Sequence, residues 1–340
     1  RVQAQPPDAN PDVSAASGSS RKQRLTALAL CLVIAVSGAA LLSKRSKTPA
    51  PVEPAAAEAT ESVGLVTTSH TGEADAEEVT PTAAVILAGT HEQDEDYTWN
   101  TAAEIQIALN GTTASVDGDG VIVAGSTVTL TQPGTYHLSG NLDDGQVIVD
   151  TQDDETVQLI LDGVEITSTT SAPVYVSKAE KVILILAENS QNTLTDGSTY
   201  TNIDVEENEP NAALFSKVNL TIYGSGELTV NANFEDGITS KDGLLIEGAT
   251  ITVNAVDDGI RGKDYLVVKD GNLVITAYGD GLKSDEEDDT SLGYVQIEGG
   301  TFEITTGGDA IAAQTNVLIN NGTYLLTTGG GSGSVPEDSV

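Results

Sequence analysis

From about Tyr97 onward, apolar residues alternate with polar ones, and Gly residues and Asp-Gly pairs interrupt the alternation. Val, Ile and Leu at every second position predict short β-strands that bury one face. This part of the sequence lacks the apolar spacing of an amphipathic helix. We therefore expect an all-β domain.

A short motif, Asp-Gly-Ile or a variant of it, recurs through the second half of the chain. It begins at Asp236, Asp258, Asp280 and Asp309, so that the spacings are 22, 22 and 29 residues. The last spacing is longer because an acidic insertion, SDEEDDTSLG (284–293), lies within it. Repeats of this length are typical of architectures that stack one structural unit on the next.

Three further rows keep the same spacing as the motif. Two are apolar and one is small: Ile246, Val268, Ile297 and Ile319; Val253, Ile275, Ile304 and Leu326; Ala249, Gly271, Gly300 and Gly322. Roughly 22 residues without helical periodicity fit one coil of a β-solenoid. We expect a parallel β-helix whose coils stack at roughly 4.8 Å, and the small row would allow sharp corners between strands.

The chain before the β-domain divides by composition. Residues 1–24 are predicted to be a disordered tail, and residues 43–95 a disordered linker rich in Pro, Ala, Thr and Glu. Between them, the uncharged apolar run 25–42 just reaches the length that spans a bilayer. It is either a transmembrane anchor or a cleaved signal segment. The β-domain is expected over 96–331, followed by a flexible end at 332–340.

The chain is strongly acidic, with 15 Lys and Arg against 51 Asp and Glu and a formal net charge of -36. Seven of the basic residues lie within the first 47 positions, so the β-domain is even more acidic than the average. Such a surface repels phosphate backbones, which excludes nucleic acid as a partner. It favours divalent cations or basic partners instead.

The Asp row (Asp236, Asp258, Asp280 and Asp309) is a candidate calcium site. Stacked carboxylates about 5 Å apart repel one another by roughly 3 kcal/mol at an effective dielectric near 20, so the repetition calls for a cation. Calcium–oxygen distances of about 2.3–2.6 Å would let one ion bridge two coils. The alternative is that Asp-Gly is simply favourable turn chemistry. The full candidate set of metal ligands adds Asp257, Asp242, Asp264 and Asp285.

A row of basic residues follows the same spacing. Lys178, Lys217, Lys241 and Lys263 occupy matching positions, while Arg261 and Lys283 lie three residues after their aspartates. These side chains either neutralise the Asp row or bind an anionic sugar together with calcium. On the second interpretation the substrate-binding residues are Lys241, Lys263, Arg261 and Lys283.

Several segments together resemble one known family. They include GTYHLSGNLDDGQVIVD (134–150), NAALFSKVNLTIYGSGELTV (211–230), DGITSKDGLLIEG (236–248), DDGIRGKDYLVVKDG (257–271) and IEGGTFEITTGGDAI (297–311). The family is the bacterial calcium-binding parallel β-helix carbohydrate-binding domain of clostridial type, and the resemblance covers about 96–331. It implies a right-handed parallel β-helix similar to that of calcium-dependent pectate lyases, bound calcium, an extracellular location, and binding of acidic plant polysaccharide such as polygalacturonate, or of cellulose.

Three functions remain open at this stage. The first is calcium-dependent, non-catalytic polysaccharide binding at the bacterial cell surface, with the chain anchored through 25–42 or secreted. The second is a calcium-dependent pectate lyase, which needs a Lys or Arg as the base, although no residue of a regular Lys row stands out for that role. The third is a structural cell-surface adhesin.

Overall fold

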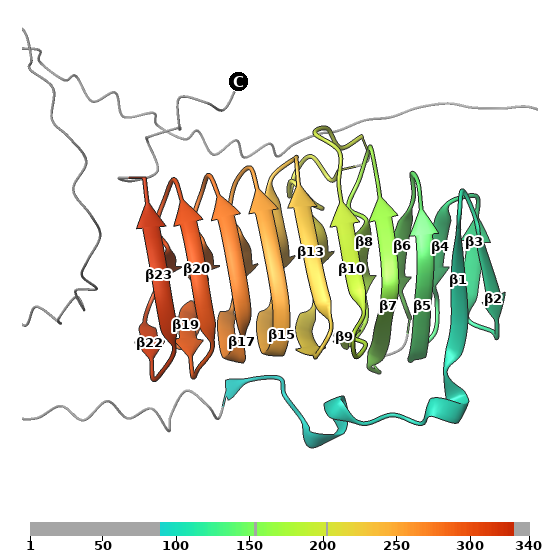
Figure 1. Cartoon of the computed structure of the whole chain (residues 1–340), viewed down its shortest axis with the longest axis horizontal. Helices are drawn as coiled ribbons and strands as arrows, with labels where there is room; N and C mark the ends of the chain where they lie inside the picture. The colour runs from blue at the N-terminus through green and yellow to red at the C-terminus, as the bar shows by residue number, and fades with distance from the viewer. Residues whose placement is uncertain (1–88, 153–154, 202, 330–340) are drawn as a thin grey trace, which may run out of the picture. The chain divides into compact units, whose positions relative to one another are not determined.

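The computed structural model describes residues 89–152, 155–201 and 203–329. Figure 1 shows the strands of this part lying side by side in chain order, each beside strands from the preceding and following coils. Among the strands of the described residues, antiparallel pairing occurs where β2 pairs with β1 and where β3 pairs with β4, and outside the strands an isolated antiparallel bridge joins Asp204 and Glu209. All other strand pairs of the described residues are parallel.

The larger sheet of the described residues has 14 strands. Its main path runs through β2 (Ala114–Asp117), β1 (Ile105–Gly111), β5 (Gly134–Leu142), β7 (Val157–Thr167), β10 (Gln191–Thr195), β13 (Glu227–Ala232), β15 (Gly243–Ala255), β17 (Tyr265–Ala277), β19 (Tyr294–Ile297) and β22 (Val317–Ile319). Four more strands pair with members of that path: β9 (Lys181–Leu186), β12 (Asn219–Gly224), β20 (Thr301–Thr306) and β23 (Thr323–Thr328).

The smaller sheet of the described residues has nine strands and carries the Asp-Gly motifs at one edge. In spatial order they are β21 (Ile311–Ala313), β18 (Leu282–Ser284), β16 (Ile260–Gly262), β14 (Asp236–Ser240), β11 (Ala212–Ser216), β8 (Val174–Lys178), β6 (Gln146–Asp150), β4 (Thr127–Leu130) and β3 (Val121–Ala124).

The predicted rows pair with one another in the structure. Ile246, Val268, Ile297 and Ile319 are successive partners, as are Val253, Ile275, Ile304 and Leu326. Because side chains alternate between the two faces of a strand, this register places apolar residues of both sheets in one common core. The prediction that a shared spacing means a shared register is therefore confirmed.

The predicted fold class needs a correction. The structure is all-β, as predicted. Six of its strands close into a ring of parallel pairs, and further strands extend the sheet on either side of the ring. This arrangement is not the predicted right-handed parallel β-helix solenoid. The ring runs β7, β9, β12, β15, β13 and β10 and returns to β7.

The ring closes because β7 and β15 continue through positions where the spacing predicts a corner between two strands. β15 pairs with β12 along its first half and with β13 along its second half. Gly248 has a positive φ of 70° and lies at an irregularity in the pairing, which lets the strand bend without ending. Gly163 in β7 has a similar φ of 72°.

The predicted transmembrane segment is not tested by the described residues. No helix within the described ranges is long and apolar enough to cross a membrane. The apolar run 25–42, the tail 1–24, most of the linker 43–95 and the end 332–340 lie outside the described residues.

An N-terminal segment, residues 89–103, lies along β9, β12 and β17 and contains the short 3₁₀ helices η3 (Asp94–Tyr97) and η4 (Thr101–Ala103). One of its attachments is an ion pair between Asp96 and Lys181, with 2.6 Å between carboxylate oxygen and Nζ. Both side chains are almost fully buried. Trp99 packs against Ile160, Ile183 and Ile185 and so holds this segment against the sheet.

Candidate functional site

The Asp row lies where strands of the smaller sheet begin. Ile238, Ile260 and Leu282 pair in register, and each follows its aspartate by two residues. One carboxylate oxygen of each aspartate accepts a hydrogen bond from the backbone N–H of the next aspartate in the row. The distances are 3.2 Å from Asp258 to Asp236, 2.7 Å from Asp280 to Asp258 and 2.8 Å from Asp309 to Asp280. The row therefore caps backbone donors, which is the turn chemistry considered as the alternative.

The other carboxylate oxygens meet different partners along the row. Lys283 Nζ lies 2.8 Å from Asp258 Oδ2 and 3.2 Å from Asp280 Oδ2. Burial would lower the pKa of Lys283, but the hydrogen bonds and charges of these two aspartates outweigh it and raise the pKa. A lysine thus occupies the position between two coils where the spacing predicted calcium.

Three aspartates from the next pair of neighbouring coils lie close together, and we call them the aspartate cluster. One carboxylate oxygen each from Asp236, Asp257 and Asp258 lie within 4.8 Å of one another. Burial, and next the charge of Asp258, raise the pKa of Asp236 to about 7, although Arg261 opposes the rise. The Arg261 guanidinium is 3.8 Å from Asp236 Oδ2, too far for a hydrogen bond. Of the three carboxylates, Asp258 is therefore the one with a described cation, Lys283, within hydrogen-bond distance.

The donor set of this cluster fits a hard divalent cation. Carboxylate oxygens are the ligands that calcium prefers, and the separations allow one ion to contact three of them. Glycine is needed beside the cluster: a Cβ on Gly279 would lie 2.5 Å from Asp257 Oδ1 and 2.6 Å from Asp258 Oδ1. Asp280 adjoins this cluster, since its backbone N–H donates to Asp258, and the other candidate ligands are not among its three members. Asp309 is exposed, and Asp242 and Asp264 are half-buried, their pKa values raised by burial.

The basic residues predicted to bind substrate are all in ion pairs. Lys241 Nζ lies 2.7 Å from Glu209, and Lys263 Nζ lies 2.7 Å from Glu286. Arg261 makes two contacts with Asp285, at 2.8 and 3.1 Å, so Asp285 is a partner of the guanidinium. Lys217 shares Glu209 at 2.8 Å.

The carboxylates in these pairs come mainly from two insertions, the loop before β11 and the acidic insertion 284–293. Sequence reasoning missed Glu209 and Glu286 as partners because insertions fall outside the repeat. The available signal was that two acidic runs interrupt the coils next to the Lys row.

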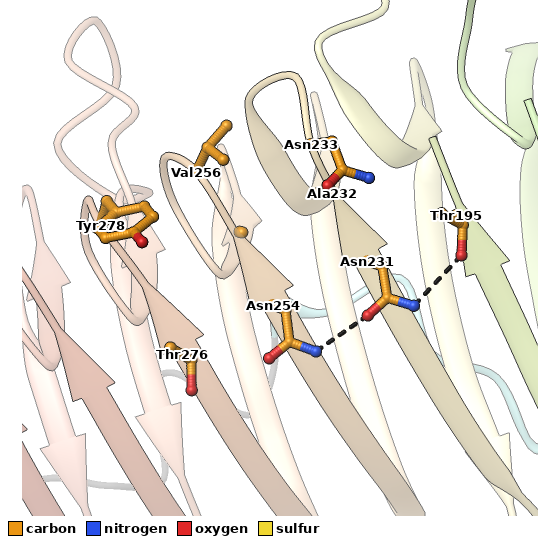
Figure 2. Close-up of a pocket in the computed structure, with 9 residues that line it drawn as sticks. Thr195, Asn231, Ala232, Asn233, Asn254, Val256, Thr276 and Tyr278 are labelled. Atoms are coloured by element: carbon orange, nitrogen blue, oxygen red, sulfur yellow. Dashed lines mark hydrogen bonds between the residues drawn. The ribbon is translucent and has the colours of Figure 1, made fainter. Parts of the chain in front are cut away.

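A second surface lies on the larger sheet, at the carboxyl ends of β10, β13, β15 and β17 (Figure 2). We call it the polar groove. It has a volume of about 540 Å³ and is lined by Thr195, Asn231, Ala232, Asn233, Asn254, Ala255, Val256, Thr276 and Tyr278. Asn254 Nδ2 donates to Asn231 Oδ1 at 3.0 Å, and Asn231 Nδ2 donates to Thr195 Oγ1 at 3.2 Å. Sequence reasoning also missed the groove, although its polar row follows the spacing of the coils.

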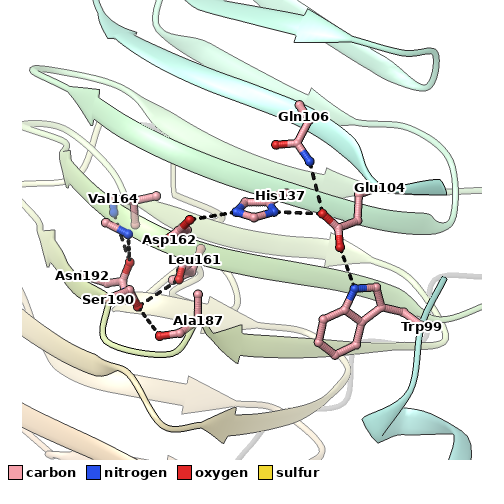
Figure 3. A network of polar contacts seen from close by, with 11 residues as sticks. Trp99, Glu104, Gln106, His137, Leu161, Asp162, Val164, Ala187, Ser190 and Asn192 are labelled. Atoms are coloured by element: carbon pink, nitrogen blue, oxygen red, sulfur yellow. Dashed lines mark hydrogen bonds and ion pairs between the residues drawn. The ribbon is translucent and has the colours of Figure 1, made fainter. Parts of the chain in front are cut away.

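A third polar feature centres on His137 (Figure 3). Its Nδ1 lies 2.9 Å from Glu104, and its Nε2 lies 3.1 Å from Asp162. Burial would lower the pKa of His137, but hydrogen bonds to the two carboxylates outweigh it and raise the pKa. Trp99 Nε1 donates to Glu104 at 2.8 Å, so this network ties η4 and β1 to β5 and β7. Both imidazole nitrogens are engaged within the protein, which suits a structural role.

Comparison with known proteins identifies the family. The model for the carbohydrate-binding domain-containing proteins matches residues 124–339. The chain belongs to this family. A protein of Acetivibrio thermocellus with the same description is 50% identical over 202 residues, which is 59% of this chain and 71% of the relative.

A solved structure is also similar to this chain. It is that of the polysaccharide lyase-like protein from C. thermocellum, a gadolinium derivative. The identity is 37% and the TM-score is 0.59, and the match covers 67% of this chain and 98% of the other.

Proposed function

We propose that this family member binds an acidic polysaccharide without cleaving it, and that a calcium ion held by Asp236, Asp257 and Asp258 is required for binding. The observation that carries the proposal is the aspartate cluster itself: three converging carboxylates, of which, among the described residues, Asp258 alone has a cation within hydrogen-bond distance. When bound, calcium would supply positive charge to which a uronate carboxylate can bind.

The surroundings of the cluster support an anionic ligand only in the presence of the metal. Arg261 and Lys283 lie beside it, but each is held by carboxylates of the chain itself. Since the protein is strongly anionic, a uronate can approach only where an added cation reverses the local potential. The similar solved structure was obtained as a gadolinium derivative, and a lanthanide, like calcium, is a hard cation that prefers oxygen ligands.

The contacts of the basic residues favour binding over lyase chemistry. A lyase base must be able to lose its proton near the working pH. The hydrogen bond from Lys263 to Glu286 raises the lysine pKa, and Arg261 and Lys283 also have raised pKa values. These side chains therefore stay protonated at neutral pH and are poor bases.

The proposed setting is the bacterial cell surface. The acidic β-domain would be displayed outside the cell, with the apolar run 25–42 as its anchor, or secreted if that run is cleaved. The polysaccharide is proposed to be a plant cell-wall polyuronate such as polygalacturonate.

Affinity electrophoresis in gels that contain polygalacturonate tests this function. We expect retardation in calcium and none in excess chelator. Asp257→Asn should weaken binding about tenfold, because it removes one charged ligand while keeping the shape of the side chain. Asp119→Asn, at an exposed aspartate outside the cluster, is the control and should bind like the wild type. Equal retardation in calcium and in chelator would contradict the proposal, as would release of unsaturated uronate.

A further inference from the structure

The polar groove is built from one residue of each of four successive strands. Thr195 pairs with Asn231, Asn231 with Asn254, and Asn254 with Thr276. The next residue along each of the last three strands is an alanine that turns toward the core: Ala232, Ala255 and Ala277. The polar row therefore faces outward, and its members are spaced by the distance between parallel strands, about 4.8 Å.

Residues from the loops after the strands form the other wall of the groove (Figure 2). Tyr278 and Val256 expose 43% and 41% of their surface, so both side chains are open to a ligand. Asn233 is held in place, since its Nδ2 donates to the Asp196 carbonyl at 2.8 Å and its backbone N–H donates to the Asp196 carboxylate. The groove thus joins an ordered amide and hydroxyl row to an exposed aromatic ring.

The chemistry of the groove differs from that of the rest of the surface. None of its lining residues carries a charge at neutral pH, in a chain whose formal net charge is -36. Amide groups donate and accept hydrogen bonds at the same time, as vicinal sugar hydroxyls require. An exposed tyrosine ring offers a flat apolar face with a polar tip, which suits the C–H face of a sugar ring. Grooves with a few ordered polar groups and apolar walls are typical binding sites.

We propose that the polar groove binds an uncharged glycan chain, at a site separate from the aspartate cluster. Asn231, Asn254 and Thr276 would bond the hydroxyls of successive sugars, and Tyr278 would stack on one ring. The inference rests on the family's carbohydrate binding but not on calcium, because the groove contains no carboxylate. Polyuronate binding and neutral-glycan binding are then independent properties of two surfaces.

Isothermal titration of the full chain with neutral hexasaccharides tests the proposal. The probes are the β-1,4-linked hexaoses of glucose, xylose and mannose, each titrated in calcium and in excess chelator. We expect at least one to bind equally in both conditions. Tyr278→Ala should weaken that binding about tenfold or more, while Tyr278→Phe should keep it, because the ring and not the hydroxyl makes the stacking contact.

Matched variants guard against loss of fold. Asn254→Ala removes a member of the polar row and should also weaken binding, whereas Asn272→Ala, at an exposed position on the same sheet outside the groove, should not. A melting curve for each variant identifies any that is unfolded. If Asn254→Ala is unfolded, the glycan affinity of Tyr278→Ala tests the proposal in its place.

Two results would overturn the groove assignment. One is that none of the three hexaoses binds, even where polygalacturonate is retained in calcium, which would leave the proposed function standing alone. The other is neutral-glycan binding that Asp257→Asn or chelator abolishes and Tyr278→Ala leaves unchanged, which would place the glycan on the charged edge.

Discussion

The protonation of His91 makes the stability of the folded chain, to which the N-terminal segment belongs, depend on pH. Its ring nitrogens lie 2.6 Å from the Tyr265 hydroxyl and 2.8 Å from the Thr221 hydroxyl. Burial, and next the charge of Lys181, lower the pKa of His91 to about 4. The folded protein therefore keeps His91 neutral under conditions in which a solvated histidine is protonated.

The pKa of His91 predicts a loss of stability in acid. Between about pH 6.5 and pH 4 the unfolded chain binds a proton at this histidine that the folded chain does not bind. The free energy of unfolding should fall over this window by up to about 3 kcal/mol from this group alone. Urea unfolding of the wild type and of His91→Gln at pH 7.5 and pH 4.5 measures the effect. The difference in stability between the two proteins should shrink at the lower pH, and a difference that stays constant would contradict the assignment.

Individual residues of the charged edge show which positions the sequence could predict and which contacts it could not. The repeat predicted the positions of Asp236, Asp258 and Asp280, because a shared spacing gives a shared register once parallel strands pair. It left open whether Lys283 neutralises the Asp row or binds an anionic sugar, and the structure places the lysine Nζ beside two of these aspartates. It did not predict the contacts of Glu209 and Glu286, which belong to insertions without a repeat.

At the scale of elements, the N-terminal segment depends on a buried ion pair between η3 and β9. Asp96 and Lys181 are 85 positions apart, and neither belongs to a repeated row, so the sequence carries no signal for their contact. Lys181 Nζ also donates to the His91 carbonyl at 3.3 Å. One lysine thereby fixes two points of the segment.

Removing this lysine should destabilise the protein strongly. Lys181→Met leaves the Asp96 carboxylate buried without its cation, which typically costs about 3–5 kcal/mol. Lys178→Met, three residues earlier and exposed, should change stability by less than about 0.5 kcal/mol. Urea unfolding of both variants at pH 7 compares them. Similar stabilities for the two would show that the buried pair does not hold the segment.

Elements also account for the error in the predicted architecture. The spacing gives the length of one coil, but it does not show whether a strand ends at a corner or bends and continues through it. Gly248 and Gly163, both at positive φ, let β15 and β7 continue, so that each of these strands pairs with two other strands of the ring and the ring of six strands closes. A glycine in the sequence is compatible with either outcome.

At the scale of the whole molecule, the charge distribution separates two kinds of surface. Most basic residues of the β-domain lie on the edge that carries the Asp row, where acidic insertions neutralise them. The polar groove on the larger sheet is uncharged. The family match gives carbohydrate binding for the molecule as a whole, and we propose that the charged edge binds an anionic ligand and the polar groove a neutral one.

Calcium binding by the aspartate cluster is the central claim, and a calorimetric titration of calcium into chelator-treated protein tests it most directly. We predict a binding isotherm for the wild type, its loss or severe weakening in Asp257→Asn, and its retention in Asp119→Asn. Because Asp257 is exposed and repelled by Asp258, the variant should fold at least as stably as the wild type without calcium. Heats of dilution alone for the wild type, or the same isotherm for Asp257→Asn, would contradict the claim.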